Sequence, residues 1–113
     1  MECIFCKIVA GEIPTDIVYS DEEFLAFRDI QPQAPKHLVI IPKSHIASVT
    51  QLTDKQQGLI GRFILLAKKL AEKEGLSPSG YRLSINCGAD GGQFVPHLHL
   101  HLLGGRRLDD QLG

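Results

Sequence analysis

The chain has 113 residues, of which 43% are hydrophobic and 22% charged, and its 12 basic and 13 acidic residues leave a net charge of −1. This length predicts one domain over residues 1–113, and the balanced charge argues against nucleic acid or an acidic membrane as a partner. The sequence has no apolar run long enough to cross a membrane and no signal-peptide pattern, so we expect no membrane association. Three cysteines are an odd number without disulfide-scaffold density, which favours a reducing cytoplasm.

The first half of the chain predicts several short elements. Gly11, Pro14 and further turn residues punctuate the hydrophobic runs. The predicted elements are a short helix over 3–9, short strands over 17–19 and 24–28, an apolar strand over 37–41 that Pro42 stops, and one or two helical turns over 44–49. His37 starts the third strand, and we expect it to be structural or exposed.

One long helix is predicted between Thr53 and Gly75. Thr53 is placed to cap the N-terminus, and Gln56 follows three residues later as in a capping box. Gly75 is placed to end the helix in the left-handed conformation. Hydrophobic residues follow the i, i+3, i+4 spacing of a core-facing stripe. The predicted core face consists of Ile60, Phe63, Ile64, Ala67, Leu70 and Ala71.

The last third of the chain predicts a hairpin. Residues 81–87 form one expected strand, residues 88–92 form a glycine-rich loop, and residues 97–103 form the second strand. Two strands joined by a short loop are expected to pair, which places Asn86 near the second strand. The order of elements predicts the α+β fold class, with one long helix and one or two short ones.

The second strand of the hairpin carries His97, His99 and His101 in alternation with leucines. Successive side chains of a strand point to opposite faces, so the three imidazoles share one face and the leucines face a core. A solvated face would more often carry Lys, Glu, Thr or Ser. Geometry argues against a site in which all three histidines bind one metal, because residues four apart lie about 13 Å apart and Zn–N bonds are about 2.0–2.1 Å. At most two adjacent histidines could share one ion. The pattern favours nucleophilic catalysis, in which a central imidazole forms a labile bond to phosphorus.

The loop over 88–92 supports a phosphate-binding role. Glycines allow backbone N–H groups to approach a phosphate, although a plain turn needs the same residues. The neighbouring histidines favour phosphate contact, to which Asn86 and Gln93 could add side-chain hydrogen bonds.

Cys3 and Cys6 form a C-x-x-C pair that lacks the strand–helix context of a redox motif. Two cysteines supply half of a tetrahedral zinc site, and His45 and His97 are candidates for the other half. The alternatives are two small buried cysteines and a surface histidine, and the spacing by itself leaves both readings open. Cys87 is expected to be a core or strand residue without a role.

Several motifs of this chain, including the histidine strand, resemble those of a known protein family. The run His97-Leu-His99-Leu-His101-Leu-Leu resembles the His-φ-His-φ-His-φ-φ signature of the histidine-triad superfamily, and further segments resemble its Hint branch. These segments are Phe27-Arg28-Asp29-Ile30, Pro32-Gln33-Ala34-Pro35, residues 37–45, Gly80-Tyr81-Arg82, Asn86, Asp90-Gly91-Gly92-Gln93 and Leu103-Gly104-Gly105-Arg106.

The resemblance implies an antiparallel sheet with flanking helices, a homodimer, and hydrolysis of adenosine 5′-monophosphoramidates. It implies that His99 is the nucleophile that forms a nucleotidyl-histidine and that His101 contacts the phosphate. It places Asn86, Gly92 and Gln93 around the phosphate and leaving group. It also implies that Asp29 binds the ribose hydroxyls and that Ile30, Phe5 and Phe27 line the base pocket.

Relatives with an N-terminal C-x-x-C complete a structural zinc site with two histidines. The resemblance therefore implies that Cys3, Cys6, His45 and His97 bind Zn²⁺ here. A metal-bound His97 would stiffen the strand that aims His99, and it would not transfer protons itself.

The chain departs from the family pattern at three places. Phe94 stands where some relatives have a Ser whose hydroxyl contacts the substrate, so only a backbone contact carries over at this substrate-binding position. Pro96 replaces an aromatic residue, and the segment over 106–113 lacks a bulky aromatic tail that reaches the partner's site in the family. These departures concern leaving-group preference.

Three hypotheses follow. The preferred one is a purine nucleotide-binding phosphoramidase with a nucleotidyl-histidine intermediate and a structural zinc. The second is a dinucleoside polyphosphate hydrolase or nucleotidyl transferase of the same superfamily. The third is a zinc-stabilised interaction module in which the histidine triad is a vestige.

Overall fold

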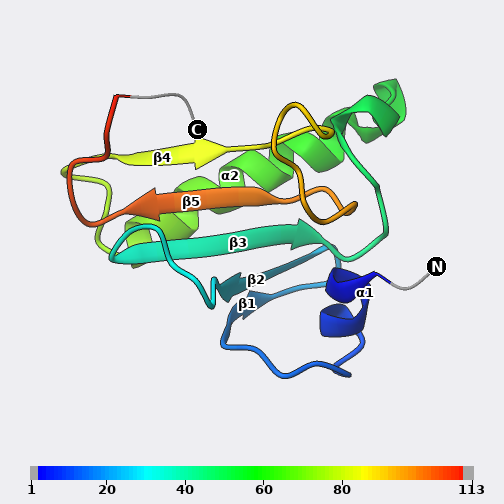
Figure 1. Cartoon of the computed structure of the whole chain (residues 1–113), viewed down its shortest axis with the longest axis horizontal. Helices are drawn as coiled ribbons and strands as arrows, with labels where there is room; N and C mark the ends of the chain where they lie inside the picture. Colours follow the sequence, from blue (N-terminus) through cyan, green and yellow to red (C-terminus); the bar gives the residue numbers. More distant parts are fainter. Residues whose placement is uncertain (1–2, 111–113) are drawn as a thin grey trace.

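The computed structural model describes residues 3–110 and forms a five-stranded antiparallel sheet in the order β1-β2-β3-β5-β4 (Figure 1). This architecture confirms the predicted α+β class and the five strands. The elements are α1 (Ile4–Val9), β1 (Ile17–Ser20), β2 (Phe24–Arg28), β3 (Lys36–Pro42), the 3-10 turns η1 (Val49–Gln51) and η2 (Asp54–Gln56), α2 (Gln57–Lys73), β4 (Tyr81–Ser84) and β5 (Leu100–Gly104).

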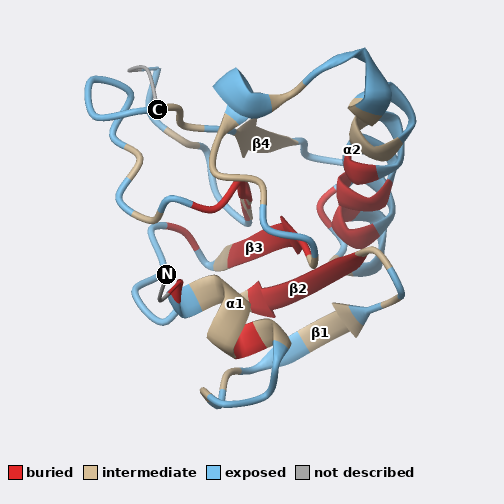
Figure 2. Ribbon diagram, turned by 90° about the vertical axis from the view of Figure 1, so that its right-hand side faces the viewer, coloured by how far each residue is buried: buried red, intermediate tan, exposed pale blue. Residues whose placement is uncertain are grey.

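Helix α2 covers one face of the sheet and buries the larger core against it (Figure 2). Alternate side chains of β3 and β5 point to this face, as the period of two in a strand requires. Phe63 of α2 is fully buried and stacks on Phe24 of β2, with ring centroids 5.5 Å apart. This core also includes Leu38 and Ile40 of β3, Leu100 and Leu102 of β5, and Leu98 just before β5. The prediction that the leucines between the histidines face a core is confirmed.

The opposite face of the sheet carries the short helix α1 over a smaller core. Ile8 of α1 is buried against residues from β2 and β3 whose side chains alternate with those of the larger core, namely Leu25, Phe27, Val39 and Ile41. Helix α1 covers β2 and β3 on this face. The part of the face over β5 is therefore left for a cavity. The histidines of the triad belong to this second face.

The long helix begins with the predicted cap. The Thr53 hydroxyl accepts a hydrogen bond from the Lys55 N–H, and the Gln56 side chain accepts one from the Thr53 N–H. Gly75 has a φ of +76° and ends the helix as predicted. Ile64, however, is 39% exposed, whereas Leu66 is buried in the core. The hydrophobic spacing predicted that one side of the helix faces the core, but not which residues lie at the middle of that side. The position of the sheet determines those residues.

Two further predictions are corrected by the backbone. Residues 45–48 are not helical; Ile46 accepts a hydrogen bond from the Leu98 N–H at 2.7 Å, which holds this segment beside the triad. The strand expected over 97–103 is regular only from Leu100, although the alternation of its side chains persists from His97. The strand expected over 81–87 ends at Ser84, and it pairs with β5 as predicted.

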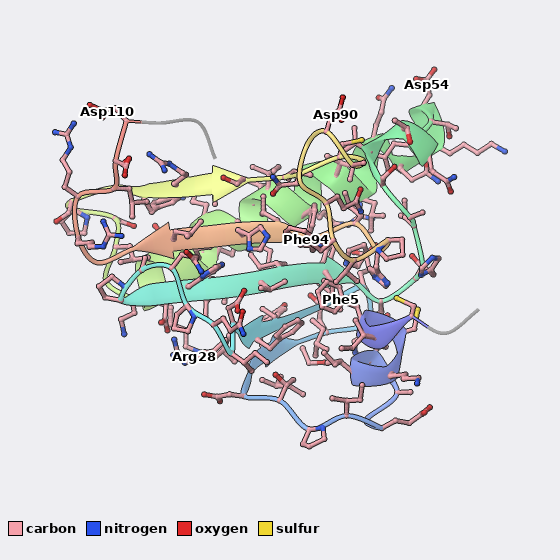
Figure 3. All side chains as sticks on the ribbon, in the orientation of Figure 1. Phe5, Arg28, Asp54, Asp90, Phe94 and Asp110 are labelled. Atoms are coloured by element: carbon pink, nitrogen blue, oxygen red, sulfur yellow. The ribbon has the colours of Figure 1, made fainter. Side chains whose placement is uncertain are left out.

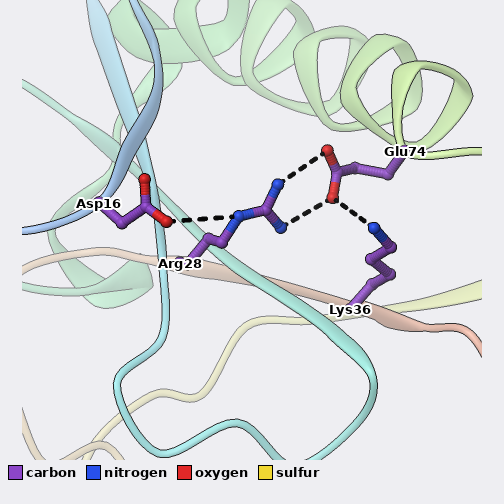
Figure 4. Close-up of polar contacts among 4 residues, drawn as sticks. All are labelled: Asp16, Arg28, Lys36 and Glu74. Carbon is purple, nitrogen blue, oxygen red and sulfur yellow. Dashed lines mark hydrogen bonds and ion pairs between the residues drawn. The ribbon is translucent and has the colours of Figure 1, made fainter.

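An ion-pair network joins the end of β2 to the end of α2 (Figure 4). Arg28 donates two hydrogen bonds to the Glu74 carboxylate, at 2.8 and 3.2 Å. Lys36 lies 3.6 Å from the same carboxylate, and Asp16 lies 3.6 Å from the Arg28 Nε. The network fixes the strand end immediately before Asp29.

Within residues 3–110, none of the helices has the length and apolar character needed to cross a membrane.

Candidate active site and metal centre

A cavity of about 660 Å³ lies on the sheet face that α1 leaves open. Its wall includes residues from α1, from the loop after β2, from β3 and from the hairpin. The side chain of His101 reaches the cavity beside that of Val39, its antiparallel partner in β3. Of the predicted substrate-binding residues, the cavity brings together Phe5, Phe27, Asp29, Ile30, Asn86, Gly92, Phe94, His99 and His101.

The imidazole of His99 is held in one orientation. Its Nδ1 lies 2.7 Å from the His97 carbonyl oxygen, which can only accept a hydrogen bond, so Nδ1 carries the proton. The Nε2 of the neutral ring therefore keeps its lone pair. The ring of Phe5 meets His99 edge-on at 5.1 Å and packs against it. His99 is buried and lines the cavity, so it presents the Nε2 of a ring whose orientation is fixed.

The tautomer of His101 is assigned by a chain of hydrogen bonds. The Gln33 N–H donates to the Nδ1 of His37 at 3.0 Å, so a neutral His37 carries its proton on Nε2. This Nε2 lies 2.9 Å from the Nδ1 of His101 and donates to it. The remaining proton of His101 is then on its Nε2, as a donor for a bound group.

Both of these imidazoles are neutral at pH 7. Burial, together with the neighbouring His99 and His37, lowers the pKa of His101 to about 4, against the opposing effect of the Asp29 carboxylate. Burial also lowers the pKa of His37, against the opposing charge of Asp29. The two rings therefore act as directional hydrogen-bond donors rather than as cations.

His37 is a site residue that the sequence analysis missed. It was expected to be structural or exposed, but it is 6% exposed and lines the cavity beside His101. A signal was present in the sequence, since His37 directly precedes the apolar residues 38–42 of the strand and shares the face of Val39 and Ile41. The partner that gives it a role, His101, is 64 residues away in the chain.

One end of the cavity combines a carboxylate with aromatic rings. Asp29 accepts a hydrogen bond from the Gln31 N–H through Oδ1, and its Oδ2 lies 3.5 Å from the Nε2 of His37. Phe5 and Phe27 contact each other edge-on at 5.6 Å. Ile30 follows Asp29 and is 88% exposed at the cavity wall. A carboxylate beside an apolar wall suits a ribose diol attached to a flat base.

The other end contains the glycine-rich loop. The Asn86 side chain donates to the Gly91 carbonyl at 2.7 Å, which ties the start of the loop to its tip. A Cβ at Gly91 would lie 2.3 Å from the Cys87 carbonyl oxygen, so only glycine fits there. Gly92 has a φ of +78° and lines the cavity.

Gln93 is placed differently from the other predicted phosphate-binding residues. Its side-chain amide donates to the carbonyl oxygens of Ala47 and Val95, at 2.8 and 2.9 Å, and accepts from the Gly88 N–H at 2.9 Å. Both N–H groups of the amide are therefore used by the backbone, and Gln93 is absent from the cavity wall. The side chain clamps the loop instead of facing the cavity.

The four predicted metal ligands converge at the N-terminus of α1. The thiols of Cys3 and Cys6 and the Nδ1 atoms of His45 and His97 all lie within 4.8 Å of one another. The separations between these atoms are 3.4 Å for Cys3–His97, 3.3 Å for Cys6–His45, 3.7 Å for Cys6–His97 and 3.2 Å for His45–His97. Tetrahedral zinc with bonds of about 2.0–2.3 Å requires ligand separations of about 3.3–3.8 Å. The donors fit such an ion in number, type and spacing.

The surroundings of His97 support the same conclusion. Its Nε2 donates to the Pro42 carbonyl at 2.8 Å, which directs the lone pair of Nδ1 toward the cysteines. Burial lowers the pKa of His97, which keeps the ring neutral and able to bind a metal. Cys87 lies outside this cluster; it was expected in the core or in a strand, but it follows the end of β4 and is half-buried.

A second group of potential ligands, Asp29, His37 and His101, also lies within 4.8 Å. The hydrogen bonds argue against a metal there. An ion would need the lone pair of His37 Nε2, but the Gln33 N–H already occupies Nδ1 and leaves the proton on Nε2. The hydrogen-bonded chain runs instead from the Gln33 N–H through His37 to His101, with Asp29 beside it.

Comparison with known proteins agrees with this site. A family profile described as the C-terminal binding domain of the scavenger mRNA decapping enzyme matches residues 2–109. The chain is 50% identical over 111 residues to the purine nucleoside phosphoramidase of Escherichia coli K12, an alignment that covers 98% of this chain and 93% of the relative.

Solved structures show the same fold. A HIT family hydrolase from Legionella pneumophila Philadelphia 1 superposes with a TM-score of 0.97 at 54% identity, covering 99% of this chain and 100% of that one. A zinc-bound histidine-triad protein from Mycobacterium smegmatis superposes with a TM-score of 0.79 at 34% identity, covering 100% of this chain and 81% of that one. From its triad, its fold and these relatives, the chain belongs to the histidine-triad (HIT) family.

Proposed function

We propose that this protein is a purine nucleoside phosphoramidase that hydrolyses adenosine 5′-monophosphoramidates through a nucleotidyl-His99 intermediate. The observation that carries the proposal is the bond from His99 Nδ1 to the His97 carbonyl, which leaves an unprotonated Nε2 on a ring that lines the cavity. The activity of the E. coli relative, at 50% identity, supports the same chemistry.

In the first step, His99 Nε2 attacks the α-phosphorus. A bond forms from Nε2 to phosphorus, the P–N bond of the substrate breaks, and the amine leaves after taking a proton from water. The positive charge that develops on the imidazole is stabilised by the His97 carbonyl at 2.7 Å. In the second step, water attacks the phosphorus, the His99 Nε2–P bond breaks, and the nucleoside monophosphate leaves with neutral His99 restored. The proton that the attacking water loses neutralises the hydroxide left by the first step.

The remaining residues position the substrate. His101 donates from Nε2 to a phosphate oxygen, and His37 fixes the tautomer that makes this possible. Asn86 and Gly92 bind around the phosphate, and Gln93 holds their loop in place. Asp29 accepts hydrogen bonds from the ribose hydroxyls, while the base lies among the apolar side chains of Phe5, Phe27 and Ile30.

The metal in this proposal is a structural zinc ion. Cys3, Cys6, His45 and His97 would hold it in a closed tetrahedral site, which supplies rigidity and leaves no open position for substrate. The zinc-bound M. smegmatis relative supports this assignment. His97 is two residues from His99, so fixing its ring also restrains the backbone carbonyl that orients the nucleophile.

We further propose that the enzyme is a cytoplasmic homodimer. Strand β4 is an edge strand of the sheet, so its free edge can pair with a second copy of the chain. Exposed apolar side chains such as Leu65 on α2 can pack against that second copy. Thiol ligands require a reducing compartment, which supports the cytoplasm. Light scattering of the purified protein tests the dimer directly.

The decisive experiment compares the wild type with His99→Ala on adenosine 5′-phosphoramidate and on diadenosine polyphosphates. We expect wild-type turnover of the phosphoramidate and a loss of at least about 10³-fold in the variant, with unchanged metal content and circular dichroism. Activity that survives the substitution would refute the intermediate. Preference for the polyphosphates would support the second hypothesis, and failure to bind any purine nucleotide would support the interaction module.

A further inference from the structure

The cysteine pair and the nucleophile are joined by two direct connections. The first is His97, whose Nδ1 lies 3.4 Å from the Cys3 thiol and whose carbonyl oxygen accepts the hydrogen bond that orients His99. The second is Phe5, which stands between the two cysteines in the sequence and meets the His99 ring edge-on at 5.1 Å (Figure 3). A change at the cysteines therefore reaches the nucleophile from two sides.

Helix α1 depends on the metal ligands for its position. It has six residues, and a helix of this length is not stable without tertiary contacts. Ile8 is its one buried residue, with Phe5 and Val9 partly buried against the same core. The start of the helix is held by Cys3 and Cys6, which lie against histidines from two distant segments. Loss of these contacts should loosen the end of α1 that carries Phe5.

The two thiols are placed to react with each other. Cys3 caps α1, and its sulfur accepts a hydrogen bond from the Cys6 N–H at 3.4 Å. The two sulfurs belong to a set of donor atoms within 4.8 Å of one another, so a shift of less than about 3 Å would bring them to bonding distance. Cys3 is buried, whereas Cys6 is half-buried and its contact with His45 is exposed. An oxidant from solvent therefore meets Cys6 first.

We propose that Cys3 and Cys6 form a peroxide-sensitive switch, in which a disulfide between them releases the metal and turns the enzyme off. This inference rests on the proposed function and concerns the regulation of its site. The Cys6 thiolate attacks hydrogen peroxide; an S–O bond forms, the O–O bond breaks and hydroxide leaves. The Cys3 thiolate then attacks the Cys6 sulfur; the S–S bond forms, the S–O bond breaks and a second hydroxide leaves.

The balance of this reaction is two thiolates and one peroxide giving one disulfide and two hydroxides. The two sulfurs lose two electrons in total, and the peroxide gains them. His45 and His97 are then the remaining ligands of the cluster, too few to hold a tetrahedral ion. Because a thiol reductant reverses the S–S bond, the protein should recover when reductant and zinc are restored.

Oxidation should disturb the nucleophile without unfolding the sheet. His97 keeps the bond from its Nε2 to the Pro42 carbonyl, but its Nδ1 loses its place in the metal site. Its backbone carbonyl and the Phe5 ring, both in contact with His99, are then less restrained. A displacement of about 1 Å at a reacting group can cost about 10²-fold in rate, so we expect a loss of that size in kcat/KM.

The test uses the zinc-loaded Cys87→Ser protein, in which Cys3 and Cys6 are the only thiols. Cys87 lies outside the cluster, so this background should keep its metal and activity. The protein is treated with hydrogen peroxide and then with excess dithiothreitol and zinc. Bound zinc, thiols per denatured chain and kcat/KM for adenosine 5′-phosphoramidate are measured at each stage. We expect peroxide to remove both thiols, the zinc and about 10²-fold in kcat/KM, and the second treatment to restore all three.

The matched control is Cys6→Asp in the same background. A carboxylate can bind zinc in place of the thiolate, but it cannot form a disulfide. The zinc content and kcat/KM of this variant should therefore be the same before and after peroxide. Parallel loss of zinc and activity in Cys6→Asp would overturn the disulfide as the cause.

The measurements on the Cys87→Ser protein decide the proposal by themselves. Zinc and thiols that persist under peroxide sufficient to oxidise free cysteine would overturn the switch. Loss of zinc with an unchanged kcat/KM would overturn the connection to His99, and loss of activity with zinc and both thiols intact would place the damage elsewhere. Failure of the proposed function is distinguishable, because it would appear as no turnover by the reduced, zinc-loaded protein before any peroxide is added.

Discussion

Replacing Glu74 with glutamine isolates the ion pair that holds the end of β2 next to Asp29. The Glu74 side chain is 12% exposed, and Arg28 donates to it in a two-point pair at 2.8 and 3.2 Å. Glutamine has nearly the same shape and keeps one acceptor, but it removes the charge and places an N–H group against the guanidinium. The pair loses its charge-assisted character while the packing of the helix end is preserved.

The expected cost is about 1.5 kcal/mol of unfolding free energy. Hydrogen bonds to charged groups contribute about 1.5–3 kcal/mol, and we take the low end because the Arg28 side chain is 38% exposed and partly screened. For a chain of this size, a loss of 1.5 kcal/mol corresponds to a Tm lower by roughly 6 °C. The matched control is Glu72→Gln on the same helix, where the carboxylate is 53% exposed and 3.6 Å from Lys68, so its effect should stay below about 0.5 kcal/mol.

The pH dependence gives a sharper check. The hydrogen bonds from Arg28 lower the pKa of the Glu74 carboxyl below its ordinary value, and Lys36 adds to this effect. The stability that Glu74 contributes is therefore complete above the unfolded-state pKa of about 4.3, and it is lost as the pH falls through the lower folded-state pKa. Urea unfolding between pH 3 and 7 measures the difference in unfolding free energy between the wild type and Glu74→Gln. A difference that is as large at pH 3 as at pH 7, or an equal loss of stability in Glu72→Gln, would refute the reasoning.

Two further predictions concern the histidines and the metal. Burial lowers the pKa of His101 to about 4 in the folded state, below an unfolded value of about 6.5, so its contribution to stability is complete above pH 6.5 and is lost as the pH falls toward 4. Urea unfolding should show this slope in the wild type and a smaller slope in His101→Gln, and identical slopes would contradict it. Cys6→Ser should lose bound zinc on dialysis against a chelator and melt several degrees earlier, whereas Cys87→Ser, which lies outside the cluster, should retain one zinc per chain by elemental analysis. Equal zinc content in the two variants would exclude the proposed ligand set.

The features that follow from local pattern were predicted correctly from the sequence. The alternation of His and Leu placed the imidazoles and the leucines on opposite faces, and the structure confirms this even where β5 is not yet regular. Thr53 and Gly75 bound the long helix because caps depend on neighbouring backbone groups. The pairing of β4 with β5 was predicted from a short loop; the connection in the structure, over residues 85–99, is longer, but the two strands pair as expected.

Other features depend on contacts between distant segments. Residues 44–49 were expected to be helical, but hydrogen bonds to Leu98 and Gln93 hold this segment in a non-helical path past the metal centre. Ile64 was expected in the core but is exposed, and Leu66 is buried instead. The position of the sheet, rather than the helix itself, decides which side of the helix is covered. Gln93 was expected at the phosphate, and its amide is used by three backbone groups instead.

The sequence by itself therefore indicated the family, the strand of alternating histidines and, through the family resemblance, the four candidate metal ligands, because motifs can be recognised without knowledge of the fold. Only the tertiary structure decided which nitrogen of each imidazole carries the proton. The tautomer of His101 depends on His37, which lies 64 residues away, and that of His37 depends on the Gln33 N–H. A hydrogen-bond direction is a property of two groups in contact, and contact across the sheet exists only after the chain has folded.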